Sequence, residues 1–203
     1  ELQRLLTEGG ARRGWVSLMS SGMMPHVLPE PSDLERVRDR LTDERMPPEE
    51  AWATVLLEVA NPDVVIAAWG QRLRMPKALS RHVSQAVNIA MKLLGYSELT
   101  TAQRKRLLRR AESETACRVA TRAVAAGQRA GEALETAQAD AARWTAAELW
   151  PPQLISGDTL VASGHRPGPG FKRALDAVED AQLEGQVDDE AQALALALAT
   201  LER

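Results

Sequence analysis

The sequence has little of what marks several common classes of protein. It holds one cysteine, Cys117, in 203 residues, so no internal disulfide can form, which fits a reducing compartment. Aromatic residues make up 3% of the chain, and no apolar run approaches the roughly 20 residues that a membrane-spanning helix needs. The histidines His26, His82 and His165 lie far apart, so no zinc site is indicated. We therefore expect a cytoplasmic protein with no membrane span.

Familiar catalytic signatures are missing as well. We find no closely spaced carboxylate pair for two-metal chemistry, no glycine-rich phosphate loop with lysine and serine or threonine, and no nucleophile elbow. The sequence therefore assigns no catalytic residue, metal ligand or cofactor to this chain. It begins at Glu1 rather than methionine, so we expect a fragment or a processed product of a longer protein.

Helix-forming residues, by contrast, are abundant. Alanine and leucine are frequent and runs of β-branched residues are scarce, which favours helix over strand. Apolar residues recur at helical spacing along 76–95, and residues 101–148 are rich in alanine and arginine with glycine interruptions. Ser32 and Glu35 form a capping-box pattern that predicts another helix start. We therefore predict an all-α fold built from many helices.

Two consecutive prolines, Pro151 and Pro152, predict the boundary of a small C-terminal unit. Within this unit the pattern predicts a short helix from about residue 158, a second from about 169 to 184, and a last one from about 188. The net charge of the chain is −3, but basic residues concentrate in its middle and acidic ones in its last fifty residues or so. Such asymmetry can steer a polyanion to one face.

The turn before the second of these helices is the most distinctive motif. It reads SGHRPGPG, and a helix start of this kind leaves amide donors that, with the helix dipole, suit a phosphate. A bound anion would offset the cost of placing basic residues in the first helical turn. The candidate phosphate-binding residues are Gly168, Pro169, Gly170, Lys172 and Arg173. The motif looks like the hairpin of helix-hairpin-helix nucleic-acid binders, and a plain tight turn between helices is the alternative.

A second candidate is the basic run in the middle of the chain. Arg106, Arg109 and Arg110 can share one face of a helix and could follow a phosphate backbone. The alternative is a solvated helix face whose arginines pair within the helix with Glu112 or Glu114.

Other basic and aromatic residues carry weaker signals. Arg12 and Arg13 lie in a stretch flanked by glycines, and as loop arginines they are further candidates for RNA contact, with ordinary surface positions as the alternative. We interpret the tryptophans as packing anchors rather than base-stacking platforms, because most of them have core spacing. These tryptophans are Trp15, Trp52, Trp69, Trp144 and Trp150.

Three stretches together resemble one enzyme family. They are ELQRLL, GWVSLMSSGMMPHVLPE and, most strongly, ISGDTLVASGHRPGPGFKRALDAVEDAQLEGQVDDEAQAL. Each is similar to part of the C-terminal region of bacterial class II tRNA nucleotidyltransferases, the CCA-adding enzymes and their poly(A) polymerase relatives. Phe171 departs from the family pattern, where small or acidic residues are common.

The resemblance implies a neck at 1–31, a helical body at 32–150 and a helical tail at 151–203, which together bind the acceptor and elbow region of tRNA. Gly168, Pro169, Gly170 and Lys172 match the family's tail motif. It also implies an N-terminal catalytic head in the same polypeptide, which holds Mg²⁺ with CTP or ATP and is absent here.

Two alternatives to CCA addition stay open. The parent enzyme could be a poly(A) polymerase, although the acidic C-terminus argues against the basic extension that such enzymes often carry. A helical protein-interaction module is the alternative from another class, and it predicts no salt-dependent affinity for RNA.

Overall fold

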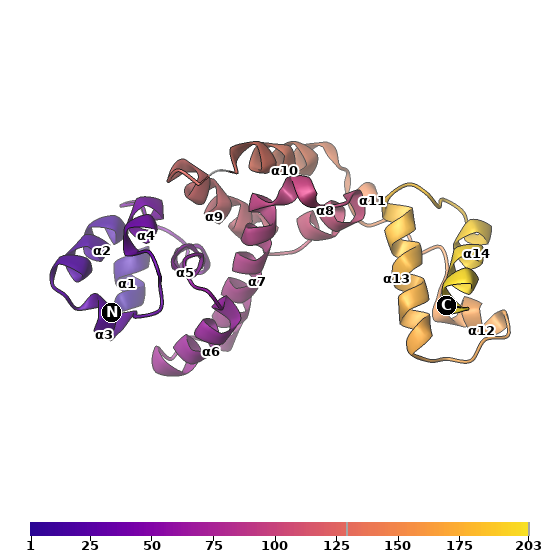
Figure 1. Ribbon diagram of the computed structural model, residues 1–203, viewed down its shortest axis with the longest axis horizontal. Helices are drawn as coiled ribbons and strands as arrows, with labels where there is room; N and C mark the ends of the chain where they lie inside the picture. The colour runs from indigo at the N-terminus through magenta and orange to yellow at the C-terminus, as the bar shows by residue number, and fades with distance from the viewer. Residues whose placement is uncertain (129, 203) are drawn as a thin grey trace. The chain divides into compact units, whose positions relative to one another are not determined.

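The computed structural model describes residues 1–128 and 130–202, and these residues form helices and connecting segments with no strand (Figure 1). The predicted all-α fold is confirmed. The chain divides into two compact units: the first comprises Glu1–Ser97 and Ala111–Ala139, the second Glu98–Arg110 and Asp140–Arg203. The second unit is therefore built from two separate stretches of chain.

The first unit is a set of helices with α5 at its centre. Its elements are α1 (Leu2–Thr7), α2 (Ala11–Ser20), α3 (Met24–Val27), α4 (Leu34–Arg40), α5 (Pro48–Leu56), α6 (Pro62–Arg72), α7 (Lys77–Leu94) and α9 (Ser113–Ala125). Every residue of α5 from Glu50 to Leu56 is buried, because α5 packs against α1, α7 and α9. A 3-10 turn at Tyr96–Glu98 and helix α10 (Gly131–Arg143) carry the chain across the boundary between the units.

Two buried carboxylates, Glu50 and Glu58, form ion pairs with arginines in the first unit. The Glu50 carboxylate is 2% exposed and accepts from Arg118 Nε at 2.8 Å and from Arg122 Nε at 2.7 Å. Arg40 is 3% exposed and pairs with Glu58 at 2.5 Å. Burial lowers the pKa of Arg40, and the attraction of Glu58 opposes that shift without cancelling it.

The predicted helix starts are mostly confirmed, with one shift. Asp33, rather than Ser32, caps α4, and its carboxylate accepts from the Arg36 amide at 2.9 Å. The Ser32 hydroxyl instead donates to the Glu58 carbonyl oxygen at 3.0 Å. The predicted capping residue was therefore wrong by one position, because Ser32 bonds to Glu58, just after α5, rather than to the start of its own helix.

The second unit contains a short helix pair and a three-helix tail. Its elements are α8 (Thr101–Leu108), α11 (Ala146–Leu149), α12 (Gly157–Ala162), α13 (Pro169–Leu183) and α14 (Glu190–Leu201). The three tail helices enclose an apolar core centred on Leu160, Ala174, Val178 and Ala193, and Phe171 packs against it. Helix α8 packs against α13 and α11, so this segment joins the tail helices in one compact unit.

Candidate nucleic-acid interface

The turn between α12 and α13 is shaped by the way α12 ends. Gly164 has φ +89°, a left-handed conformation that glycine adopts without strain. Its amide donates to the Val161 carbonyl at 2.9 Å, and the His165 amide donates to the Leu160 carbonyl at 3.2 Å. These two bonds are the Schellman pattern, which satisfies the last carbonyls of a helix and sends the chain sharply away.

The start of α13 follows four residues later, at Pro169. Gly168 is the N-cap residue with extended backbone, φ −172° and ψ 179°, which any residue can adopt. A Cβ built there would meet nothing closer than the Arg166 carbonyl oxygen at 4.0 Å. Neither conformation nor space therefore requires glycine at this position. The feature that glycine supplies is an unobstructed backbone, as at sites where a ligand approaches closely.

Gly170 is constrained in a different way, by the last helix. A Cβ on Gly170 would lie 3.1 Å from Leu201 Cδ2, which is tighter than ordinary packing. Phe171 is half-buried against the tail core, so its departure from the family pattern fills space inside the unit. The turn is thus held on its inner side by α14, while Gly168 remains exposed.

The basic side chains around this turn are exposed and unopposed. Lys172 and Arg173, the candidate phosphate ligands, are both exposed, and Arg166 in the turn is exposed as well. Within residues 1–128 and 130–202, no carboxylate lies within ion-pair distance of these three cations. Arg166 was missed from the sequence, where it stands outside any helix, although its place inside the glycine–proline motif was a usable signal.

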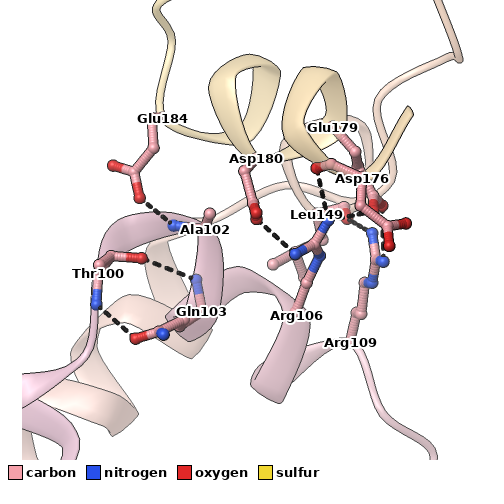
Figure 2. A network of polar contacts seen from close by, with 10 residues as sticks. All are labelled: Thr100, Ala102, Gln103, Arg106, Arg109, Leu149, Asp176, Glu179, Asp180 and Glu184. Atoms are coloured by element: carbon pink, nitrogen blue, oxygen red, sulfur yellow. Dashed lines mark hydrogen bonds and ion pairs between the residues drawn. The ribbon is translucent and has the colours of Figure 1, made fainter. Parts of the chain in front are cut away.

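The basic run of α8 has a different environment. Arg106 pairs with both Glu179 and Asp180 of α13, and Arg109 Nη2 lies 2.8 Å from Glu179 Oε1 (Figure 2). Arg109 also donates to the Leu149 carbonyl at 3.4 Å. The carboxylates that pair with this basic run therefore come from α13, whereas the sequence suggested Glu112 or Glu114.

Charge and hydrogen bonding set the pKa of the central carboxylate in this cluster. Partial burial by itself would raise the pKa of Glu179, but hydrogen bonds from Arg109 and Arg106, together with their charges, outweigh burial and lower it. Glu184 caps α8 from the end of α13, because it accepts from the Ala102 amide at 2.7 Å, and this bond lowers the pKa of Glu184. Helix α8 is thereby fastened to α13 at its start and along its length.

The three predicted arginines do not share a helix face. Helix α8 ends at Leu108, since the Arg109 amide closes the last turn by bonding to the Lys105 carbonyl at 3.1 Å. Arg106 and Arg109 turn toward α13, while Arg110 lies beyond the helix end and is exposed. Of the three, only Arg110 has no ion-pair partner among the described residues.

Arg12 and Arg13 are helical rather than part of a loop, which corrects the sequence prediction. Helix α2 begins at Ala11 because Gly10 takes the left-handed conformation at its N-cap, φ +83°, and Asp43 accepts from the Arg13 amide at 3.2 Å. Both side chains are exposed and weakly paired: Arg12 lies 3.4 Å from Asp39, and Arg13 lies 3.5 Å from Asp43.

The five tryptophans differ in burial, and Trp144 is intermediate. Trp15, Trp52 and Trp69 are at most 1% exposed, as predicted for packing anchors. Trp150, however, is 60% exposed, so the packing interpretation was wrong for it. Its position between a four-residue helix and the double proline was the available signal, because so short a helix offers no face on which to bury a large ring.

The described residues offer no obvious metal site and no membrane span. Among residues 1–128 and 130–202, no three side chains of histidine, cysteine, aspartate or glutamate come together in a way that could hold a metal ion. No helix in the same ranges is both long enough and apolar enough to cross a bilayer.

A comparison with models of protein families finds a match. The family model described as tRNA nucleotidyltransferase domain 2 matches residues 46–198, which is most of the chain and includes the α12–α13 turn and α8. No curated protein and no solved structure matches the chain.

Proposed function

Because the chain belongs to the tRNA nucleotidyltransferase family through domain 2 of those enzymes, we propose that it binds and positions tRNA for CCA addition at the 3′ end. In this proposal the chain holds the tRNA by phosphate and shape contacts and does not itself transfer nucleotides. The acceptor and elbow region of tRNA is the part that it contacts.

One observation carries the proposal. The exposed cations Arg166, Lys172 and Arg173 surround the start of a 15-residue helix and have no carboxylate partner among the described residues. Cations in ion pairs must give up a partner before they can bind a phosphate, whereas these three need not. Lysine and arginine contacts to phosphates supply most of the sequence-independent affinity for nucleic acid. The unpaired cations of this turn therefore suit it to bind the phosphates of an RNA backbone.

The geometry of the turn supports contact by the main chain as well. Within the described ranges, the amides of Gly168 and Gly170 donate to no protein acceptor, while the Phe171 amide already bonds to the Gly168 carbonyl at 3.0 Å. A phosphate placed there would accept from the free amides at the positive end of α13. Such a contact recognises the phosphate and carries no base information.

The nucleotide chemistry belongs to another part of the same polypeptide in this proposal. An N-terminal catalytic head would hold Mg²⁺ with CTP or ATP. We therefore assign to this chain the binding and orientation of tRNA and no step of nucleotide transfer.

The experiment is a comparison of RNA affinities across a salt series. The chain is titrated with tRNA lacking its CCA end and with single-stranded poly(A). We expect tighter binding to tRNA, with an affinity that falls steeply as salt rises. Lys172→Glu and Arg173→Glu should each weaken binding about 3- to 10-fold and reduce the salt slope by about 1.

A matched charge reversal elsewhere serves as the control. Lys92 is exposed on α7 in the first unit and has no carboxylate partner among the described residues, so Lys92→Glu changes the net charge equally. Equal loss with Lys92→Glu would show a general charge effect and contradict a site at the turn. Equal affinity for both RNAs would favour a poly(A) polymerase, and binding to neither would contradict RNA binding by this chain.

A further inference from the structure

We propose that Trp150, backed by Arg109, is a stacking platform for one unpaired nucleobase of the bound RNA. This inference rests on the proposed function and deepens it, because phosphate contacts at the α12–α13 turn are blind to bases, whereas a stacked ring engages a base directly. The platform lies at the end of α11, where α11 packs against α8.

The exposure of Trp150 is the first observation. A ring of this size gains several kilocalories per mole by burial, and the chain buries Trp15, Trp52 and Trp69 almost completely. Trp150 is nevertheless 60% exposed.

The ring is also held in a defined orientation. The Arg109 guanidinium carbon lies 4.6 Å from the ring centroid, which is cation–π geometry. Arg109 is itself fixed by Glu179 at 2.8 Å and by the Leu149 carbonyl at 3.4 Å, and its side chain is only 18% exposed. One face of Trp150 is therefore covered by an immobilised group. Trp150 as a whole remains 60% exposed, so much of the residue outside this contact is accessible to solvent.

The charges around the ring favour RNA as the occupant. Arg110 follows the backing arginine and is exposed without a carboxylate partner among the described residues. Trp144, six residues before Trp150, has Lys105 at 5.5 Å and Arg143 at 5.3 Å from its ring, and Arg143 also pairs with Asp140 at 2.8 Å. Rings interleaved with cations are typical of surfaces that bind single-stranded nucleic acid, where bases stack and phosphates meet the basic groups. An apolar protein partner would find these cations unfavourable to bury.

The role of the α8 arginines changes accordingly. Arg109 is ion-paired with Glu179 and does not need to bind a phosphate. Its guanidinium instead sets the plane of the Trp150 ring. We assign it as a positioning residue, and Trp150 as the residue that touches the base. The sequence prediction of arginine–phosphate contacts along α8 is thus replaced in this proposal by an aromatic contact beside it.

The test compares RNA with and without bases. The probes are a short single-stranded RNA and a ribose-phosphate oligomer of equal length that lacks bases, each titrated into the 203-residue chain at fixed salt. We expect Trp150→Ala to weaken binding of the RNA about 5- to 100-fold, because stacking on an aromatic side chain contributes about 1–3 kcal/mol per base. Binding of the abasic oligomer should be unchanged.

Two further variants sharpen the result. Trp150→Phe keeps a flat ring and should recover part of the lost affinity, while RNA-dependent quenching of tryptophan fluorescence should fall in this variant. Val161→Ala removes an apolar side chain of the same unit that is 46% exposed, and it should change neither affinity. Thermal unfolding followed by circular dichroism confirms that each variant is folded before its affinity is compared.

Four outcomes would overturn the platform. The first is RNA affinity that is unchanged in Trp150→Ala, while Lys172→Glu still weakens tRNA binding; the proposed function then stands without the platform. The second is an equal loss for RNA and for the abasic oligomer. The third is a concentration-dependent dimer that Trp150→Ala dissociates, because the ring would then be covered by a second copy of the chain. The fourth is no binding of any RNA by the wild-type chain, which refutes both proposals together.

Discussion

Replacing Glu179 with glutamine tests the cluster that joins α8 to α13. Glutamine keeps the size and one acceptor oxygen of glutamate but loses the charge that attracts Arg106 and Arg109. Both arginines remain partly buried in the variant with less compensation for their charge. We therefore expect Glu179→Gln to lower the free energy of unfolding of the second unit, with no effect on the first unit's own interactions.

The expected magnitude follows from exposure. The Glu179 side chain is 37% exposed and the two arginines are 30% and 18% exposed, so solvent screens the attraction considerably. Exposed ion pairs contribute about 0.2–1 kcal/mol each, and two pairs sharing one carboxylate give a loss of about 1 kcal/mol. Full burial would have predicted a loss several times larger.

The assay is urea unfolding of wild type and variant across a pH series. The pKa of Glu179 is lowered from its ordinary value of 4.5, so its folded-state pKa is below its unfolded-state pKa. Such a group stabilises the protein fully above the unfolded-state pKa, and that stabilisation disappears as pH falls through the folded-state value. The difference between wild type and Glu179→Gln should therefore be constant from pH 6 to 8 and shrink below about pH 4.5.

A matched variant separates this effect from a general loss of negative charge. Glu135 is exposed on α10 and has no hydrogen-bond or ion-pair partner among the described residues, so Glu135→Gln should leave stability nearly unchanged. Equal stability of wild type and Glu179→Gln at pH 7, or a difference that persists undiminished at low pH, would refute the reasoning.

Four further substitutions have definite expectations. Gly164→Ala forces a side chain into φ +89° and should cost about 1–2 kcal/mol, whereas Gly168→Ala should leave thermal stability within about 0.5 kcal/mol yet weaken tRNA binding if a phosphate approaches the backbone there. Glu50→Ala leaves the two arginines of α9 without their buried partner, but their side chains are 40% and 28% exposed and can be solvated, so the variant should lose about 1–2 kcal/mol in urea unfolding; unchanged stability would contradict this. Leu160→Ala opens a cavity in the tail core and should cost about 2–5 kcal/mol, with near-wild-type stability as the contrary result.

The sequence predicted those parts of the fold that depend on local signals. Helical spacing and glycine stops placed α13 at Pro169–Leu183, within a residue of the predicted range, because proline at the start and glycine at the end act on neighbouring residues only. The start of α2 was missed, because it depends on Asp43, thirty residues away, accepting from the Arg13 amide.

The candidate interface was predictable in part for the same reason. Lys172 and Arg173 could be named as candidates because they lie in a motif whose parts are adjacent in sequence, and their contact with phosphate stays a prediction. The partners of Arg106 and Arg109 were not, because Glu179 is about seventy residues further along the chain and periodicity carries no information about which helices meet. The exposure of Trp150 likewise depends on how α11 packs against α8.

The capping of α8 by Glu184 has a consequence for how this region folds. Helix α8 has eight residues, too few to be stable alone. Its residues Ala102, Lys105 and Arg106 all donate hydrogen bonds to α13 or to the residue that ends it. The two helices should therefore form and melt as one foldon, although about half of the chain between them, residues 111–139, belongs to the other unit. Deleting the residues after Pro152 should therefore also unfold α8. The truncated protein would then lose the helices of the tail and α8 together.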